Sequence, residues 1–501
     1  MTTTFEDATP NPEYLIKSIA EQGYSLEAAL ADLMDNSISA SANKIEILLD
    51  MNSEPFTLFL ADNGDGMSVD RLKACMQFPS QSPDEDRSIV DLGRFGLGMK
   101  TASFSQTRRF TVLSRAKGTQ TYSARTWDVE LLKNKKWKLL VNSVCEIESI
   151  LTKYKKLSGS FLNEFNDFEA NTIIVWEGLF KFEEYLEEKN RKIALKREFT
   201  DVTSEHLSLV FHRFMEKKNN PLCIRVNNKI LNPFNPFPTK ETDFRPLKYK
   251  KRNFGNDSIK VEGFVLPSRS ITEVKQGIGK WTTKKNSLMD MEGIYIYRAN
   301  RIILFGGWNG LIKKAQRLQL ARLRVDIGNN ADHLLHLNVA KSQVIIPHEL
   351  KDAFQNYIEE LKSEAEKEYF NRGLVRFTGS KKNKIKLFEK KSTNKGLLLE
   401  INNEFPLYAS LKEELTTSQI SKLKVLIRMV NTAVNEIKKV HQPEVFTHIK
   451  TENDVKVDDL LVSIQELQNT GLDNRTIKKE MLPALGYDLA TIPMEIMELL
   501  K

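Results

Sequence analysis

The first hundred residues contain three segments whose polar side chains and glycines are spaced to handle water, metal ions and phosphates. The first segment pairs the carboxylate of Asp32 with the amide of Asn36, one turn later on an expected helix. Side chains at this spacing lie next to each other, so the carboxylate could hold a water molecule and the amide a phosphate-bound Mg²⁺. Alone, the pair is also explained by an ordinary polar helix face.

The second segment is the turn DNGDGM at residues 62–67, which follows an expected strand. A carboxylate at the end of a strand could accept a hydrogen bond from an exocyclic amine, and the glycines let the backbone approach a ring closely. As an isolated segment, it is more often a simple turn.

The third segment, DLGRFGLGMKT at residues 91–101, places closely spaced glycines before an expected helix. Backbone N–H groups in such a loop, together with the dipole at the start of the helix, favour phosphate oxygens. The glycines fit neither the spacing of a Walker A loop nor the context of a Rossmann fingerprint. The stretch from Pro79 to Thr101 is a long loop of the kind that tends to be functional, and we interpret it as a lid.

The apolar pattern indicates which elements position these segments. Asn11 begins a first helix, and a second helix begins at Ser25. The apolar residues of the second helix recur at i, i+3, i+4, i+7 and i+8, so one face is expected to be buried while Asp32 and Asn36 occupy the other. Alternating apolar residues predict strands over Lys44–Asp50, Phe56–Asp62, Arg109–Arg115 and Thr172–Glu177.

A helix that begins near Glu205 leads into a second strand-rich region. This region ends before a helix over Leu350–Phe370. Its expected strands are Cys223–Asn228, Lys260–Leu266 and Ile294–Tyr297. After Arg372 the chain becomes basic and poor in apolar residues, which indicates a linker or exposed hairpin, and the last ~110 residues show a mostly helical pattern. At ~150 residues per domain, a length of 501 residues predicts about three domains.

Composition narrows the class of protein. Lysine and arginine number 74 against 66 aspartates and glutamates, and the net charge of +8 favours a polyanionic partner only mildly. The three cysteines, Cys75, Cys145 and Cys223, are too dispersed for a CxxC metal site or a disulfide framework. No apolar run reaches the ~18 residues of a membrane span, and no export signal is recognisable. A reducing, cytoplasmic setting is expected.

Three motifs occur in the order D-x-x-x-N, DNGxGM and GRFGLGMKTAS. In this order they closely resemble the Bergerat-fold ATPases of the GHKL superfamily. This superfamily includes gyrase, the ninety-kilodalton heat-shock chaperones, histidine kinases and MutL. Two longer segments are most similar to the MORC-like and MutL-like branch of this superfamily; they are LADLMDNSISASANKIEI and LGRFGLGMKTASFSQ. The resemblance is strong over about residues 10–180. A weaker resemblance to a transducer-type domain covers Val226–Phe237, Ile294–Trp308 and His336–Pro347.

The resemblance implies an α+β protein with three parts. A Bergerat-fold α/β sandwich with an N-terminal arm and the lid would occupy residues 1–195. A transducer-like α/β (S5-like) domain would occupy residues 196–372. A basic linker and a mainly helical region would occupy residues 373–501.

The resemblance also implies roles for individual residues. Asp62 would read the adenine amino group, Asn36 would help bind Mg²⁺, and Asp32 would act as the general base. Lys341, in the second domain, would reach the γ-phosphate and stabilise the charge that develops there. The other residues implied to bind ATP are Gly64, Gly66 and Met67 around adenine, Gly93, Arg94, Phe95, Gly96, Leu97, Gly98, Met99, Lys100 and Thr101 around the triphosphate, and Thr172 near the phosphates.

One departure from the family pattern concerns the base. The family usually has Glu where this chain has Asp32, and the shorter side chain could slow hydrolysis because displacements of about 1 Å matter in catalysis. Glu27 lies roughly 140° around the helix and is a poor substitute, whereas Asp35 lies nearer and is a rival. Binding of ATP without turnover is the alternative.

The family pattern implies an ATP-dependent dimeric clamp. ATP and Mg²⁺ would order the lid, the N-terminal segment would exchange between two protomers, and hydrolysis would reopen the dimer. DNA would be the clamped partner, in DNA repair, restriction or phage defence. Four basic stretches, some interleaved with Trp137, Tyr154 and Tyr249, are compatible with phosphate contact; they are Lys133–Lys138, Lys153–Lys156, Lys248–Arg252 and Lys381–Lys391.

Two alternatives remain open. The protein could be a chaperone-like ATPase acting on other proteins, or a nucleotide-gated scaffold that recruits a separate nuclease or effector. A histidine kinase is disfavoured, because no dimerisation helix with a phospho-acceptor histidine is expected before the ATPase segment.

Overall fold

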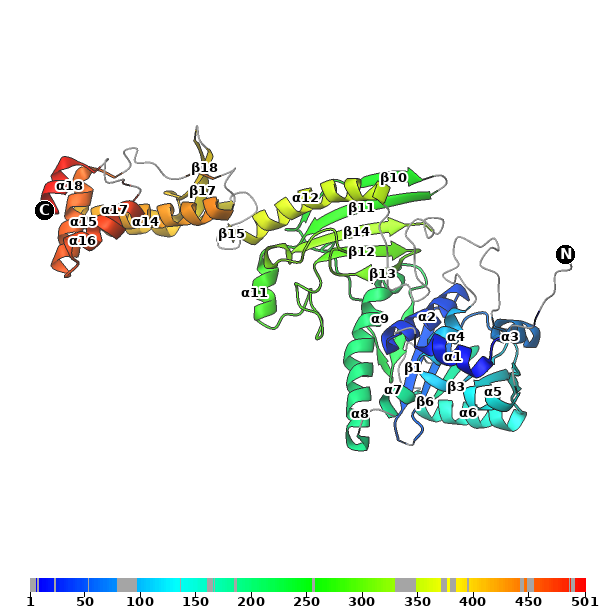
Figure 1. Cartoon of the computed structure of the whole chain (residues 1–501). Coiled ribbons are helices and arrows are strands. Elements are labelled where there is room, and N and C mark those ends of the chain that lie inside the picture. Colours follow the sequence, from blue (N-terminus) through cyan, green and yellow to red (C-terminus); the bar gives the residue numbers. More distant parts are fainter. Residues whose placement is uncertain are drawn as a thin grey trace. The chain divides into compact units, whose positions relative to one another are not determined.

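The computed structural model describes most of the chain, and all structural statements below concern these residues. They are 6, 9–21, 24–52, 54–78, 97–135, 137–159, 165, 167–183, 187–254, 257–328, 348–370, 376–378, 384–393, 396–441, 446–447, 455–485, 487 and 492–501. The chain divides into two compact units, residues 1–370 and residues 371–501 (Figure 1).

The first unit contains an eight-stranded mixed sheet with the order β5-β4-β3-β6-β2-β1-β7-β8. Neighbouring strands run antiparallel, except for the parallel pair β1 and β7. Its strands are β1 (Lys44–Asp50), β2 (Thr57–Asp62), β3 (Thr107–Ser114), β4 (Ser123–Asp128), β5 (Leu140–Val141), β6 (Thr172–Leu179), β7 (Cys223–Val226) and β8 (Lys229–Ile230). Because β7 lies beyond residue 195, this sheet extends past the end predicted for the first domain.

Helices accompany this sheet on both faces. They are α1 (Pro12–Ala20), α2 (Leu26–Ser39), α3 (Val69–Met76), α4 (Gly98–Phe104), α5 (Val129–Lys135), α6 (Val144–Leu157), α7 (Phe180–Glu183), α8 (Glu188–Arg197), the π-helix η2 (Glu198–Thr203), α9 (Ser204–Val210) and α10 (His212–Met215). The predicted helix starts are confirmed: the Asn11 side chain accepts hydrogen bonds from Glu13 N and Tyr14 N, and Ser25 is the N-cap of α2.

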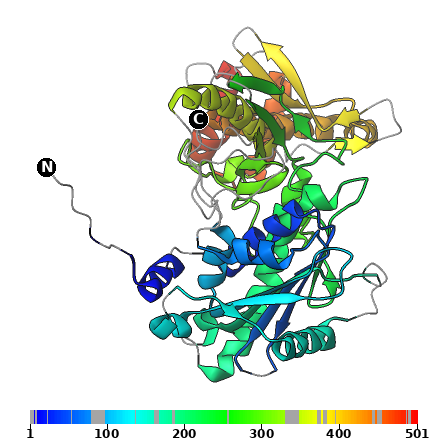
Figure 2. The same cartoon turned by 90° about the vertical axis from the view of Figure 1, so that its right-hand side faces the viewer.

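Apolar side chains that alternate along the strands form two separate layers, one on each face of the sheet. Leu58 and Leu60 of β2 face a core that includes α1, α2 and α4, whereas Phe59 and Ala61 face a smaller core that includes α6. Successive strand residues point to opposite faces, so a sheet covered on both sides has apolar residues at every position. The two helix layers lie on opposite sides of the strands (Figure 2).

A second sheet in the same unit has the order β10-β11-β14-β12-β13, with β9 also paired to β11. Helix α12 packs on one face, and Leu209 of α9 joins the core on the other. The elements are β9 (Arg245–Pro246), β10 (Lys250–Phe254), β11 (Asp257–Val265), α11 (Arg269–Lys275), β12 (Gly293–Arg298), β13 (Arg301–Phe305), the 3₁₀ helix η3 (Gln316–Leu318), β14 (Ala321–Ile327) and α12 (His348–Phe370).

Helix α9 connects the two sheets. Its Leu207 and Val210 belong to the core of the first sheet, while Leu209 belongs to the core of the second. A helix with apolar residues on two sides is buried between two layers. The hairpin formed by β12 and β13 lies beside α9, and Ala299 at its tip packs against the core of the first sheet.

The second unit has two hairpins followed by helices. Its elements are β15 (Arg376–Thr378), β16 (Lys384–Lys386), β17 (Phe388–Thr393), β18 (Gly396–Ile401), α13 (Pro406–Glu414), α14 (Thr417–His441), α15 (Val457–Asn469), α16 (Asn474–Thr476), the π-helix η6 (Ile477–Met481), α17 (Leu482–Ala484) and α18 (Met494–Leu499). Asn435 of α14 fastens one hairpin to this helix, since its side chain hydrogen-bonds both Leu399 N and Leu399 O.

The α+β architecture predicted from the sequence is confirmed. None of the described helices combines the length and apolar character needed to cross a membrane.

Candidate functional site

Asp62 lies at the end of β2 and is 3% exposed. Ser37 Oγ donates a hydrogen bond to Asp62 Oδ2 over 2.8 Å, and the backbone N–H of Gly64 donates to Oδ1 over 2.9 Å. Burial raises the pKa of Asp62 to about 6, although both hydrogen bonds act in the opposite direction. The result is a fixed, buried acceptor that is ionised at neutral pH.

The turn after Asp62 requires glycine at two positions. A Cβ atom on Gly64 would lie 2.6 Å from the carbonyl oxygen of Ala40. Gly66 has a φ of +65°, and a Cβ there would lie 1.8 Å from the carbonyl oxygen of Arg115. Only glycine adopts this conformation and fits this space, so the turn packs tightly beside Asp62.

Residues from two neighbouring strands complete this end of the site. Ser114 Oγ accepts a hydrogen bond from Met67 N over 2.9 Å and contacts the hydroxyl of Thr172 over 2.9 Å. Thr172 pairs in register with Asp62 across β6 and β2, and with Ser114 across β6 and β3. The strands therefore place Thr172 beside the carboxylate predicted to bind adenine, and its expected place near the phosphates stays a prediction. The sequence interpretation gave Ser114 no role.

The predicted phosphate segment is described only from Leu97 onward, and Gly93, Arg94, Phe95 and Gly96 lie outside the described residues. Helix α4 begins at Gly98, where an added Cβ would meet no atom of the described residues within 4 Å. The Thr101 hydroxyl donates within the first turn to the carbonyl oxygens of Leu97 and Gly98 over 3.2 and 3.1 Å. Met99 packs at the edge of the core that contains α2.

Lys100 is 1% exposed and its ammonium group binds the end of another helix. It donates to the carbonyl oxygens of Cys75 and Gln77, over 2.8 and 2.7 Å, at the C-terminus of α3. Burial lowers the pKa of Lys100 to about 8. In this structure Lys100 therefore caps α3, the helix that precedes the predicted lid.

Asp32, on α2, is 4% exposed and both of its carboxylate oxygens are engaged. The Tyr24 hydroxyl donates to Oδ2 over 3.0 Å, and Arg301 Nη2 donates to Oδ1 over 3.2 Å. Burial, with the charge of Asp32 as a second cause, raises the pKa of Tyr24, so its hydroxyl is a donor at neutral pH. The expectation that Asp32 occupies a free polar face was wrong, because the hairpin of the second sheet covers it.

Arg301 also contacts Asp35, one turn further along α2. Arg301 Nε lies 2.8 Å from Asp35 Oδ1, and both side chains are almost fully buried. Asn36, in contrast, is exposed. The two carboxylates proposed as rival bases thus share one guanidinium.

Residues 24–158 match the family described as histidine kinase-, DNA gyrase B-, and HSP90-like ATPase. This range contains the residues of the site described above except Thr172 and Arg301. This segment is a GHKL-type ATPase domain. A search of curated proteins found no match to the chain. The match supports ATP binding by this domain and ATP hydrolysis as the general activity of the family; the MutL-like and MORC-like branch stays a prediction.

The donor set of the GHKL domain fits a magnesium ion that arrives with the nucleotide. Within the described residues, no group of three or more His, Cys, Asp or Glu side chains could hold a metal ion. Mg²⁺ bound to ATP needs only one or two protein ligands, because phosphates and water supply the rest. The exposed Asn36 amide suits that role. Lys341, predicted to reach the γ-phosphate, lies in residues 329–347, outside the described residues.

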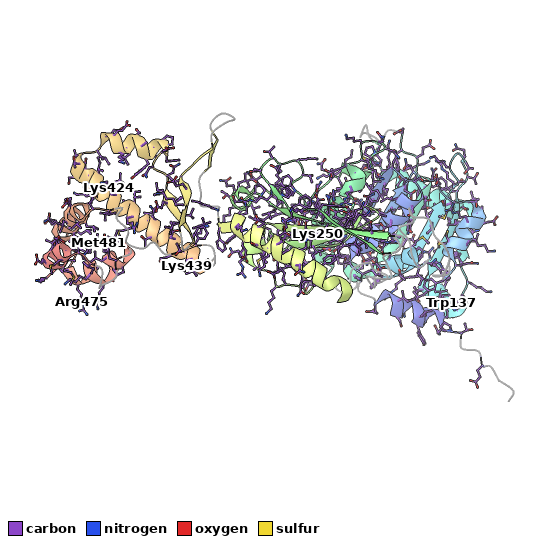
Figure 3. The ribbon with its side chains drawn as sticks, turned by 90° about the horizontal axis from the view of Figure 1, so that it is seen from above. Trp137, Lys250, Lys424, Lys439, Arg475 and Met481 are labelled. Atoms are coloured by element: carbon purple, nitrogen blue, oxygen red, sulfur yellow. The ribbon has the colours of Figure 1, made fainter. Side chains whose placement is uncertain are left out.

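Two of the three aromatic residues predicted to flank nucleic-acid contacts make contacts within the protein instead. Tyr154 is buried and donates to Glu46 over 2.8 Å. Trp137, labelled in Figure 3, stacks on Phe78 and donates to the carbonyl oxygen of Pro10. Of the three, only Tyr249 is largely exposed, at 53%.

Proposed function

We propose that this protein is a Mg²⁺-dependent ATPase in which Asp62 binds the adenine amino group and Asp32 is the general base. The observation that carries the proposal is that a single helix, α2, connects both ends of the site. Its Ser37 holds Asp62, while its Asp32 lies more than one turn earlier, and its Asn36 is free to meet a phosphate-bound Mg²⁺. Rigid helical spacing fixes the distance between the adenine end and the hydrolytic end.

In the proposed reaction, a water molecule attacks the γ-phosphorus while Asp32 accepts its proton. A bond from the water oxygen to phosphorus forms, and the bond from the γ-phosphorus to the β-γ bridging oxygen breaks, releasing ADP and phosphate. Mg²⁺ would neutralise phosphate charge, and Lys341 would stabilise the charge on the transferring group. For Lys341→Ala we expect turnover to fall more than ATP affinity.

The proposed mechanical role is an ATP-dependent dimeric clamp. Residues 79–101 would act as a lid that closes on the triphosphate, and the second sheet would transmit closure. Helix α9 supports this role, because its apolar residues belong to the cores of both sheets and would move with either. ATP can drive closure only if it binds the closed form better than the open form.

DNA is the proposed partner of the clamp, in DNA repair, restriction or phage defence. The support is a run of exposed residues, Lys248 to Lys251, that leads into the edge strand β10. Lys250, labelled in Figure 3, lies 4.9 Å above the ring of Tyr357, and Tyr249 is exposed for stacking. Cationic side chains beside an exposed aromatic ring suit a nucleic-acid backbone and base.

Light scattering and phosphate release together test this function. We expect the mass of the protein to double with a non-hydrolysable ATP analogue, but not with ADP, and ATP to release phosphate slowly. An unchanged mass with no release would contradict the clamp and favour a nucleotide-gated scaffold. DNA titration should then show an affinity that falls steeply with salt, whereas nucleotide-dependent binding of unfolded protein without DNA binding would favour a chaperone-like role.

A further inference from the structure

Arg301, on the second sheet, donates a hydrogen bond to the proposed base, Asp32. It is the first residue of β13 and follows a two-residue turn formed by Ala299 and Asn300, both with positive φ. Ala299 packs against the core of the first sheet, so the tip of the hairpin is held in place by apolar contact. The turn therefore delivers a guanidinium into the ATPase domain from a residue 269 positions away in the chain.

The guanidinium makes two separate contacts on α2. Its Nη2 donates to Asp32 Oδ1 over 3.2 Å, and its Nε lies 2.8 Å from Asp35 Oδ1. The exposed fractions of the three side chains are 6%, 4% and 1% for Arg301, Asp32 and Asp35. A buried carboxylate without a counter-ion is strongly unfavourable, and Arg301 supplies the counter-ion for both carboxylates beneath the hairpin.

The guanidinium also restricts the orientation of Asp32. Arginine presents its donors in a planar, rigid fork, and Tyr24 fixes the other carboxylate oxygen over 3.0 Å. A base is effective only when it is held within hydrogen-bonding reach of the attacking water. A carboxylate that is one methylene shorter than the usual glutamate has less freedom to compensate for misplacement, so its support matters more.

We propose that Arg301 is a positioning residue for ATP hydrolysis, which holds Asp32 in its working orientation only while the hairpin of the second sheet is seated on the ATPase domain. The proposal rests on the proposed role of Asp32 as the base. Hydrolysis then depends on the second sheet, whereas nucleotide binding does not. Arg301 itself contacts neither ATP nor water in this account.

The test compares Arg301→Gln and Arg301→Lys with the wild-type protein. For Arg301→Gln we expect kcat for phosphate release to fall by about 100-fold while the affinity for a non-hydrolysable ATP analogue changes by less than about threefold. Arg301→Lys should recover part of kcat, because it keeps the charge but not the fork. A lower kcat with an equal loss of affinity in both variants would overturn the proposal, because it would indicate general damage to the fold.

Arg324→Gln is a matched control from the same sheet. Arg324 is part of ion pairs with Glu262 and Asp326 on the second sheet. Its replacement removes arginine ion pairs that are made within the second sheet, so kcat should stay within about twofold of wild type. An equal loss of kcat in Arg324→Gln and Arg301→Gln would also overturn the proposal.

Two variants distinguish a failure of the proposed positioning role of Arg301 from a failure of the proposed base role of Asp32. If Asp32→Asn abolishes phosphate release while Arg301→Gln leaves it unchanged or faster, only the positioning role of Arg301 is wrong. If Asp32→Asn hydrolyses ATP normally, both the proposed base and the role of Arg301 are wrong. A double-mutant cycle on unfolding gives an independent readout: Arg301→Gln and Asp32→Asn should be non-additive, and additive effects would contradict the contact.

Discussion

The two ends of the proposed ATP site are built in different ways. At the adenine end, Asp62, Gly64 and Met67 lie within six consecutive residues, and their partners come from α2, β3 and β6 around the same sheet. At the hydrolytic end, Asp32 depends on a residue of another sheet, Arg301. The proposed adenine contacts are therefore contained in one sheet, whereas the proposed placement of the base requires two sheets to be docked.

This difference suggests why such a domain can serve as a switch. A binding end that is always assembled lets the domain capture ATP at any stage of a cycle. A hydrolytic end that needs a second sheet can be turned on or off by moving that sheet by a small distance.

The largest effect is expected at Asp32. Asp32→Asn should lower phosphate release by about 10²- to 10⁴-fold, because the amide cannot accept the proton of the attacking water. Affinity for ATP should be retained, as measured by calorimetry with a non-hydrolysable analogue.

Asp35→Asn is the matched control for Asp32→Asn, because both carboxylates contact Arg301. We expect Asp35→Asn to retain most of the turnover. If instead Asp35→Asn is inactive and Asp32→Asn is active, the base is Asp35.

The next largest effect is expected at Asp62. Asp62→Asn should weaken ATP and ADP binding by about 100-fold, because a buried, charge-assisted hydrogen bond to the adenine amino group is lost. Asp65→Asn changes an exposed acid in the same turn and should bind normally. Unchanged ATP affinity in Asp62→Asn would refute the adenine assignment.

The titration of Asp62 gives a smaller, pH-dependent effect. Its pKa is raised to about 6, mainly by burial, and the ionised form is the proposed acceptor for adenine. Affinity for ADP should therefore be full above pH 7 and fall as pH drops below 6, by up to about tenfold per pH unit. Calorimetry at several pH values measures this fall.

Ser37→Ala sharpens the same prediction. The Ser37 hydroxyl lowers the pKa of Asp62, so its removal should shift the fall in affinity to higher pH. Asp62→Asn should show no such fall. An identical pH profile in all three proteins would mean that another group titrates.

The smallest effect is expected at Ser114. Ser114→Ala removes the acceptor of Met67 N and the partner of Thr172, and should lower the free energy of unfolding by about 1 kcal/mol. Urea unfolding measures this change. Ser123→Ala, where the hydroxyl makes a longer contact of 3.4 Å to Ser114 O, should have less effect.

The features that lie within one sheet were easier to predict from the sequence than those that depend on both sheets. Strand β1 was predicted with the observed bounds, and the turn after Asp62 was recognised, because both depend on residues close together in the chain. The burial of Asp32 and the part played by Arg301 could not be predicted, since they depend on the docking of a distant hairpin. Likewise, β7 joins the first sheet through a parallel pairing with β1 that local patterns do not specify.

The contacts of Thr172 and Lys100 have tertiary causes as well. Thr172 lies beside Asp62 because β6 pairs with β2 in that register. Lys100 caps α3 because α3 ends within reach of the buried start of α4. A sequence motif identifies such residues, but strand register and helix packing decide which atoms they contact.

A single-turnover experiment with labelled ATP and excess protein separates binding from hydrolysis, because one sample reports both bound nucleotide and released phosphate. We expect Asp62→Asn to lose both bound ATP and phosphate release, and Asp32→Asn to retain bound ATP and lose only release. Normal release by Asp32→Asn, or normal binding by Asp62→Asn, would contradict the division of the site into a binding end and a hydrolytic end.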